Sequence, residues 1–207
     1  GLRKMHPNKV FYPDANFTMR LTYGSVGKYK PGNAVNYDFE TTLEGVFEKM
    51  DNSNPEFVVP EKLVELYNEK NYGTYANDKG FLNVCFISNN DITGGNSGSP
   101  VINSKGHLIG CAFDGNWEAM SGDIAFEHEL QRTISVDARY IVFIIDKFAG
   151  ASNIIDELTL VVNDANGQLP TYREVWLSNK NGVKDRYKTK QEFIKDAKSW
   201  WRQNKAN

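Results

Sequence analysis

Residues 94–100 read Gly94-Gly95-Asn96-Ser97-Gly98-Ser99-Pro100, and this stretch decides the fold. Apolar segments typical of β-strands flank it on both sides. A tight Gly-rich turn between two strands exposes Ser97, and the backbone N–H groups of Gly95 and Ser97 are placed to form an oxyanion hole, as acyl transfer to a serine requires. We interpret Ser97 as a nucleophile. The alternative is an ordinary surface hairpin, because glycine, asparagine and serine dominate turns in general.

The sequence on either side of the turn indicates a hairpin. Residues 81–88 are predicted to form a strand, and residues 100–103 form a second one. Ser104-Lys105-Gly106 is typical of a hairpin turn and leads into a third strand over 107–113. Residues 17–23 alternate in polarity and predict a further half-buried strand that ends at Gly24.

Helical spacing is found outside this β region. Leu43, Val46, Phe47 and Met50 predict a helix over 41–50, capped by Thr41 or Thr42. A second helix is predicted from Pro60 to a stop at Gly73. Residues 136–145 are a continuous apolar run that fits a strand or a helix equally well. Short helices are also predicted over 151–160 and over 189–203.

Composition excludes several classes of function. The chain has 207 residues, of which 40% are hydrophobic and 24% charged, which is typical of a globular domain. A net charge of −2 gives no reason to expect nucleic acid or an anionic membrane as a partner. The apolar run over 140–145 is too short to span a bilayer. Neither metal-ligand spacing nor a phosphate-binding glycine loop occurs, so we expect no metal and no cofactor.

The two cysteines, Cys85 and Cys111, lie in apolar segments that resemble strands. Buried thiols are the first interpretation, because a free cysteine behaves as a small core residue. A disulfide is the alternative, because two strands that flank one turn could bring the residues together.

Four stretches, in order, closely resemble the bacterial family of dipeptidyl-peptidases that includes dipeptidyl-peptidases seven and eleven. They are 13–24, 91–101, 113–119 and 131–140, and the resemblance covers roughly residues 8–161. It implies a chymotrypsin-like exopeptidase that removes dipeptides from peptides with a free N-terminus. The nucleophile of the family falls on Ser97. The aspartate that anchors the substrate amine falls on Asp114, for which a plain turn residue is the alternative.

The position after this aspartate governs primary specificity in the family. Members that cleave after Asp or Glu carry arginine there, whereas this chain has Gly115. The resemblance therefore implies an open, uncharged pocket and a preference for an apolar or aromatic residue before the cleaved bond, as in dipeptidyl-peptidase seven. Gly115 would also suit a turn with positive φ.

The expected fold class is mainly β with helices. The resemblance implies the second β-barrel of a chymotrypsin-like serine peptidase, part of a helical insertion and a C-terminal helical tail. The expected regions are residues 1–80, a strand region with part of the insertion; 81–162, the barrel with the nucleophile turn; and 163–207, a basic polar tail. The resemblance further implies a periplasmic or cell-envelope location in a Gram-negative bacterium.

A serine nucleophile requires a base and an orienting carboxylate, which this fold supplies upstream of the serine. His6, His107 and His128 are the histidines of the chain, and each is interpreted as solvated or structural. We expect the first barrel and a signal peptide to be missing from this chain. Because the chain begins with Gly1, we expect it to have been processed or cut from something longer. We therefore expect it to be inactive alone. The alternative is a non-catalytic peptide- or protein-binding module. A homodimer is also plausible, because loss of the first barrel would expose apolar surface.

Overall fold

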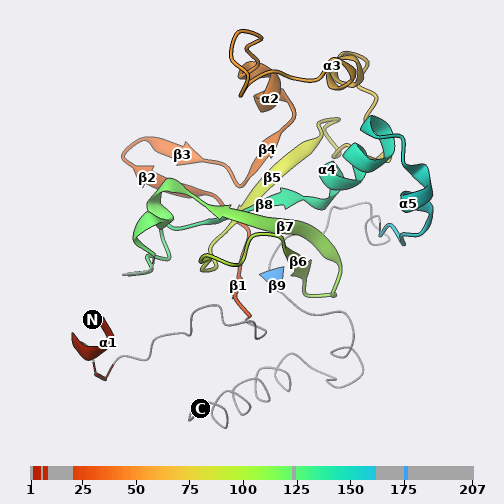
Figure 1. Cartoon of the computed structure of the whole chain (residues 1–207). Coiled ribbons are helices and arrows are strands. Elements are labelled where there is room, and N and C mark those ends of the chain that lie inside the picture. The colour runs from red at the N-terminus through yellow and green to blue at the C-terminus, as the bar shows by residue number, and fades with distance from the viewer. Residues whose placement is uncertain (1, 6, 9–20, 123–124, 162–174, 177–207) are drawn as a thin grey trace. The chain divides into compact units, whose positions relative to one another are not determined.

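The structure is a computed structural model that describes residues 2–5, 7–8, 21–122, 125–161 and 175–176 (Figure 1). Internal contacts divide the chain into two units, Gly1–Leu177 and Ser178–Asn207. The second unit lies outside the described residues, and so do the predicted helix over 189–203 and most of the predicted strand over 17–23. The predicted region boundaries at 80 and 162 stay predictions.

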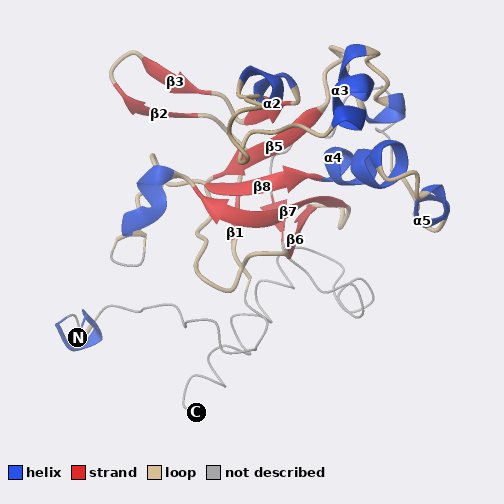
Figure 2. Cartoon of the chain, turned by 45° about the horizontal axis from the view of Figure 1, so that its top comes forward, coloured by secondary structure: helices blue, strands red, loops and turns tan. Residues whose placement is uncertain are grey.

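An antiparallel sheet organises the first unit, with the strand order β1-β9-β6-β7-β8-β5-β4. Figure 2 shows β5, β8, β7 and β6 side by side in this sheet. Its strands are β1 Tyr23–Gly24, β4 Glu40–Thr42, β5 Asn83–Ser88, β6 Ser99–Asn103, β7 Leu108–Gly115, β8 Thr133–Asp137 and β9 Val175–Trp176. A separate hairpin pairs β2 Tyr29–Gly32 with β3 Val35–Tyr37. The predicted strand over 81–88 and the hairpin that follows the nucleophile turn are both confirmed.

The helices are short. They are α1 Leu2–Met5, α2 Glu44–Glu48, α3 Glu61–Asn68, α4 Ala138–Phe143 and α5 Ser152–Asp156, with 3₁₀ turns η1 Gly73–Tyr75 and η2 Trp117–Ser121 and a π-helical turn η3 Ile144–Phe148. Figure 1 shows α4 and α5 following the end of β8. The fold is therefore mainly β with some helices, as expected.

Two apolar clusters hold these elements together. The first joins the helices to the segment that enters β5, and its buried members are Leu43, Leu63, Leu66, Tyr72, Tyr75, Leu82 and Phe143. The second lies within the sheet and is formed by Phe86, Val101, Ile109 and Ala112. β5 pairs with β4 on one side and with β8 on the other. Leu82, just before β5, belongs to the first cluster, and Phe86, within β5, belongs to the second. Both clusters therefore hold the strand that leads into the turn at Ser97.

Two helix boundaries differ from the prediction. Thr41 and Thr42 do not cap α2 but lie in β4, where they pair with Cys85 and Asn83. Their β-branched side chains favour a strand, and the cap position falls on Leu43, which has no side-chain capping bond. α3 ends before Glu69 rather than at Gly73, and Gly73 instead begins a 3₁₀ turn with φ of 59°.

The ambiguous run over 136–145 contains both structures. The strand β8 ends at Asp137, and α4 begins at the next residue. The buried Asp137 carboxylate makes this change possible, because it accepts a hydrogen bond from the Arg139 backbone N–H at 2.8 Å and so caps the helix. The same carboxylate pairs with the Arg139 guanidinium, with Nη2 at 2.6 Å from Oδ2.

We expect Asp137→Ala to destabilise the protein by about 3 kcal/mol, because it removes a helix cap and leaves the half-buried Arg139 without this carboxylate. The measurement is the free energy of unfolding in urea. Asp137→Asn is the matched variant: its amide oxygen can still cap α4 but cannot form the ion pair, so it should fall between the wild type and Asp137→Ala. Equal stability of all three proteins would contradict this role.

The disulfide alternative is wrong in this register. Cys85 and Cys111 both pair with Val136, one from each side of β8. Neighbouring strands are about 4.8 Å apart, so the two Cα atoms are roughly 10 Å apart, beyond the reach of a disulfide. Both cysteines are free, and burial raises the pKa of the Cys85 thiol. None of the helices in the described ranges has the length and apolarity needed to cross a bilayer.

Candidate active site

Ser97 is exposed in the turn between β5 and β6, and two glycines with positive φ shape this turn. Gly95 and Gly98 adopt φ values of 98° and 86°, in the left-handed region that favours glycine. Between them, the side chain of Asn96 is buried and its Oδ1 accepts a hydrogen bond from the Thr93 N–H at 3.0 Å. The Asn96 backbone donates to Thr93 O at 3.1 Å and accepts from the Ser99 N–H at 2.9 Å. The buried Asn96 thus stabilises the turn through hydrogen bonds to Thr93 and Ser99.

The two predicted oxyanion-hole donors are not used elsewhere in the described part of the chain. No hydrogen bond among those residues has the amide of Gly95 or of Ser97 as its donor. The neighbouring amides of Asn96, Gly98 and Ser99 all have backbone acceptors. A pair of unused N–H groups beside an exposed hydroxyl is what binding of a developing oxyanion requires.

Ser97 lies against the end of β7. Its Oγ donates a hydrogen bond to the carbonyl oxygen of Phe113 at 3.2 Å, and the Gly98 N–H donates to Ala112 O at 2.8 Å. Asp114 is the next residue in the strand and is exposed, with Oδ1 accepting from the Gly115 N–H at 2.8 Å. The fold therefore brings all four predicted site residues, Gly95, Ser97, Asp114 and Gly115, to one end of the β6–β7 hairpin.

Gly115 is needed for space rather than for a positive φ. It pairs with Thr133 in the sheet and is absent from the glycines with positive φ. A Cβ atom placed on it would lie 3.0 Å from the Cβ of Ala119 and 3.5 Å from Cγ2 of Ile92. The turn alternative for Gly115 is therefore wrong, and any side chain at this position would press on η2.

Asn116 is a buried residue of the site region to which the sequence analysis gave no role. Its backbone N–H donates to Arg132 O at 2.9 Å, and its Oδ1 accepts from the Arg132 N–H at 2.8 Å. Its Nδ2 donates to Leu130 O and to Glu118 Oε2, both at 2.8 Å. These four bonds fix the end of β7 that carries Asp114. The only signal in the sequence was its place in a stretch that resembles the family.

A tyrosine from the β2–β3 hairpin joins the same network. The hydroxyl of Tyr29 donates to Glu118 Oε2 at 3.0 Å, and the guanidinium of Arg132 lies 5.2 Å from the centre of the Tyr29 ring. Burial raises the pKa of Tyr29, and the Glu118 carboxylate acts in the same direction. The hydroxyl therefore remains a donor at neutral pH, which keeps η2 in place beside Asp114.

A base for Ser97 is not found among the described histidines. His107 precedes β7, whereas Ser97 contacts Phe113 near the other end, roughly 20 Å along the strand. His128 stacks edge-on against Phe126, and its carbonyl accepts from Arg132. His6 lies outside the described residues. In the part of the chain that the structure describes, no group of three or more His, Cys, Asp or Glu residues is arranged to hold a metal ion.

The described site is an exposed serine in a tight turn on an antiparallel sheet, with two unused amides in the turn and Asp114 at the end of the neighbouring strand. The peptidase S46 family matches residues 1–160. The chain belongs to this family.

Similar proteins cover the same region. Dipeptidyl-peptidase 7 of Phocaeicola vulgatus is 59% identical over 161 residues, and dipeptidyl-peptidase 7 of Porphyromonas gingivalis is 56% identical over 161 residues; each alignment covers 78% of this chain and 22% of the relative. The Asp/Glu-specific dipeptidyl-peptidase of Porphyromonas endodontalis is 53% identical over 155 residues, covering 75% of this chain and 21% of the relative. The chain thus spans about a fifth of the length of these curated relatives.

A solved structure has the same fold over this region. The crystal structure of Porphyromonas endodontalis DPP11 in complex with the dipeptide Arg-Glu has a TM-score of 0.69 and 50% sequence identity, over 75% of this chain and 22% of that chain. The resemblance to the family of dipeptidyl-peptidases seven and eleven, first made on four short stretches, is confirmed.

Proposed function

We propose that this chain supplies the nucleophile, the oxyanion hole and the amine anchor of a serine dipeptidyl-peptidase, on the second barrel of a chymotrypsin-like fold. The observation that carries the proposal is the hydrogen bond from Ser97 Oγ to Phe113 O, one residue before Asp114. Asp114 follows Phe113 in β7, which supports a role for its carboxylate near the proposed nucleophile. Two extended residues span about 7 Å, so an ammonium held by Asp114 brings the second peptide carbonyl of the substrate to Ser97.

The reaction follows from these positions. Ser97 Oγ attacks the carbonyl carbon and loses its proton to a base, and the carbonyl oxygen becomes an oxyanion held by the amides of Gly95 and Ser97. The tetrahedral intermediate collapses, the C–N bond breaks, and the leaving amine takes the proton. Water then attacks the acyl-serine ester, which releases the dipeptide and restores the serine hydroxyl. Asp114 acts throughout by pairing with the substrate α-ammonium.

The base is the part that the described residues do not provide, so we propose that the 207-residue chain does not turn over substrate by itself. The test compares the 207-residue chain with the intact gene product, meaning the full-length protein that its gene encodes, using fluorogenic dipeptidyl substrates. We expect release of the fluorophore by the gene product alone. Hydrolysis by the isolated chain would contradict this proposal, and binding of peptides by the gene product without cleavage would support a binding module instead.

For specificity, we propose that Gly115 leaves room for an apolar or aromatic side chain before the cleaved bond. Gly115→Arg should reverse the preference: kcat/KM falls at least about 10-fold for substrates with leucine or phenylalanine at that position and rises for those with aspartate or glutamate, which the guanidinium can pair with. The readout is the ratio of kcat/KM for the two substrate classes.

Because a Cβ at position 115 would lie 3.0 Å from Ala119 Cβ, steric strain is the competing cause of any loss. The double variant Gly115→Arg/Ala119→Gly relieves that contact. We expect it to keep the reversed preference and regain overall activity. An unchanged ratio in both variants would show that position 115 does not select the substrate.

A further inference from the structure

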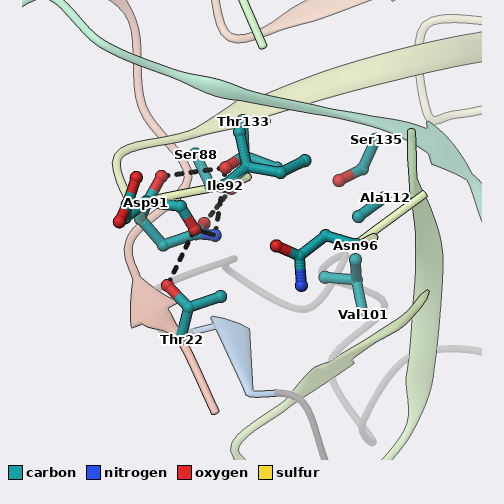
Figure 3. Close-up of a pocket in the computed structure, with 10 residues that line it drawn as sticks. Thr22, Ser88, Asp91, Ile92, Asn96, Val101, Ala112, Thr133 and Ser135 are labelled. Atoms are coloured by element: carbon teal, nitrogen blue, oxygen red, sulfur yellow. Dashed lines mark hydrogen bonds between the residues drawn. The ribbon is translucent and has the colours of Figure 1, made fainter. Parts of the chain in front are cut away.

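A small cavity lies behind the turn that carries Ser97 (Figure 3). Its volume is about 10 Å³, and its walls come from the nucleophile turn and from β5, β6, β7 and β8. Most of the surrounding residues are of polar types, but the surface that they present to the cavity is mainly apolar, so the few polar atoms that reach it matter. The residues are Thr22, Ser88, Asn90, Asp91, Ile92, Asn96, Val101, Ala112, Thr133 and Ser135.

Most polar groups on this lining are paired within the protein. Ser88 Oγ donates to Asn90 Oδ1 at 2.6 Å, and Thr133 Oγ1 donates to Asn90 O at 2.8 Å. Asn90 Nδ2 donates in turn to Thr133 Oγ1 at 3.1 Å. On the same side of the cavity, Thr22 Oγ1 donates to Asp91 O at 2.9 Å. One wall of the cavity is therefore a closed hydrogen-bond network.

Ser135 is different. Its side chain is fully buried, with a relative exposure of 0%, and its Oγ has no hydrogen-bond partner among the described residues. Figure 3 shows its hydroxyl pointing into the cavity, toward the amide of Asn96. Buried polar groups almost always have a partner, either protein or ordered water, because an unsatisfied hydroxyl is costly.

We infer that this cavity binds one water molecule, held between Ser135 Oγ and the side-chain amide of Asn96. A buried water requires a cavity of about 10–15 Å³ and at least two polar partners, and the site meets both conditions. The amide of Asn96 carries both a donor and an acceptor. The water donates to or accepts from each of the two groups, so the buried hydroxyl of Ser135 becomes satisfied.

The water has a consequence for the nucleophile. Asn96 lies between the two oxyanion-hole amides and already pins the turn through Thr93. A water that links Asn96 to Ser135 fastens the turn to β8 in the centre of the sheet. Ser135 is then a positioning residue, which acts on the Gly95 and Ser97 amides through the water and Asn96. This catalytic part of the inference rests on the proposed function, whereas the water site itself does not.

The experiment is a pair of measurements on wild type and on Ser135→Ala. A crystal structure of the wild-type protein at better than about 1.8 Å should show a water within hydrogen-bond distance of Ser135 Oγ, and Ser135→Ala should lose it or bind it with clearly weaker density. In the intact gene product, Ser135→Ala should lower kcat about 3- to 10-fold and leave KM within about 2-fold, because the oxyanion is formed only in the transition state.

Ser88→Ala is the matched control, because Ser88 is equally buried on the same cavity but already has Asn90 as its partner. It should keep both the water at Ser135 and the wild-type kcat, even where it lowers the melting temperature. A wild-type cavity without a water would overturn the inference. So would a Ser135→Ala protein with wild-type kcat and equal or higher stability. An inactive wild-type gene product would sink the proposed function and leave the crystallographic result standing.

Discussion

Under the proposed function, replacing Ser97 by alanine in the intact gene product is expected to lower kcat/KM for dipeptide release by at least about 10³-fold, because the acyl-enzyme can no longer form. What remains is catalysis by the oxyanion-hole amides and by substrate positioning. The backbone should not change, since Ser97 is exposed and its side chain makes a single hydrogen bond, to Phe113 O, within the described part of the structure. The melting temperature should therefore stay close to that of the wild type.

Ser99→Ala is the matched control, two residues after Ser97 at the start of β6. Its backbone bond to Asn96 O is kept in the variant, so activity should stay within about 3-fold of the wild type. A dipeptidyl phosphonate that labels serine nucleophiles gives a second readout: mass spectrometry should find the adduct on Ser97 in the wild type and in Ser99→Ala, and none in Ser97→Ala. Labelling at another serine would show that the nucleophile is misassigned.

Replacing Asp114 by asparagine should lower kcat/KM about 10²-fold for substrates with a free α-ammonium group, because a charge-assisted hydrogen bond becomes a neutral one. The carboxylate is exposed and bonds to the neighbouring Gly115 N–H, a contact that an asparagine oxygen can also make. The loss should therefore appear in the kinetics rather than in the stability. The measurement is kcat/KM on a dipeptidyl substrate.

A second substrate isolates the role of the charge. The same dipeptidyl substrate with its α-amine replaced by hydrogen has no ammonium to pair, so wild type and Asp114→Asn should cleave it at equal, low rates. Asp156→Asn, an exposed carboxylate in α5, is the control for the loss of one negative charge and should leave both substrates unaffected. Equal losses on both substrates would indicate that Asp114 supports the fold and not the amine.

The sequence predicted the structure best where local preferences for turns and strands match the pairing found in the sheet. The glycines around Ser97, the flanking apolar strands and the turn at Gly106 each predict the observed hairpin. It was misleading at Thr41 and Thr42, which are good caps in isolation but pair with β5 in the folded protein. It was ambiguous at 136–145, because an apolar run does not reveal that Asp137 ends a strand and caps a helix at once.

The interior of the site was beyond sequence reasoning for a different reason. Asparagine and serine are common at protein surfaces, and the sequence that flanks Asn116 and Ser135 does not predict that these two residues are buried. Their importance depends on partners 14 or 16 residues away for Asn116, and on a cavity shared by several strands for Ser135. Such contacts exist only once the sheet register is set.

The spacing of the two cysteines, on either side of Val136, has a practical consequence. Cys85 and Cys111 lie on β5 and β7, with β8 between them, so they form no disulfide with each other. The strands of this sheet can therefore pair without an oxidant and without disulfide exchange. Expression in a reducing cytosol should therefore give the same folded protein as secretion into an oxidising compartment. Variants of the 207-residue chain itself, such as Asp137→Ala, can be produced by the simpler route, and their refolding yield should be insensitive to the ratio of reduced to oxidised glutathione.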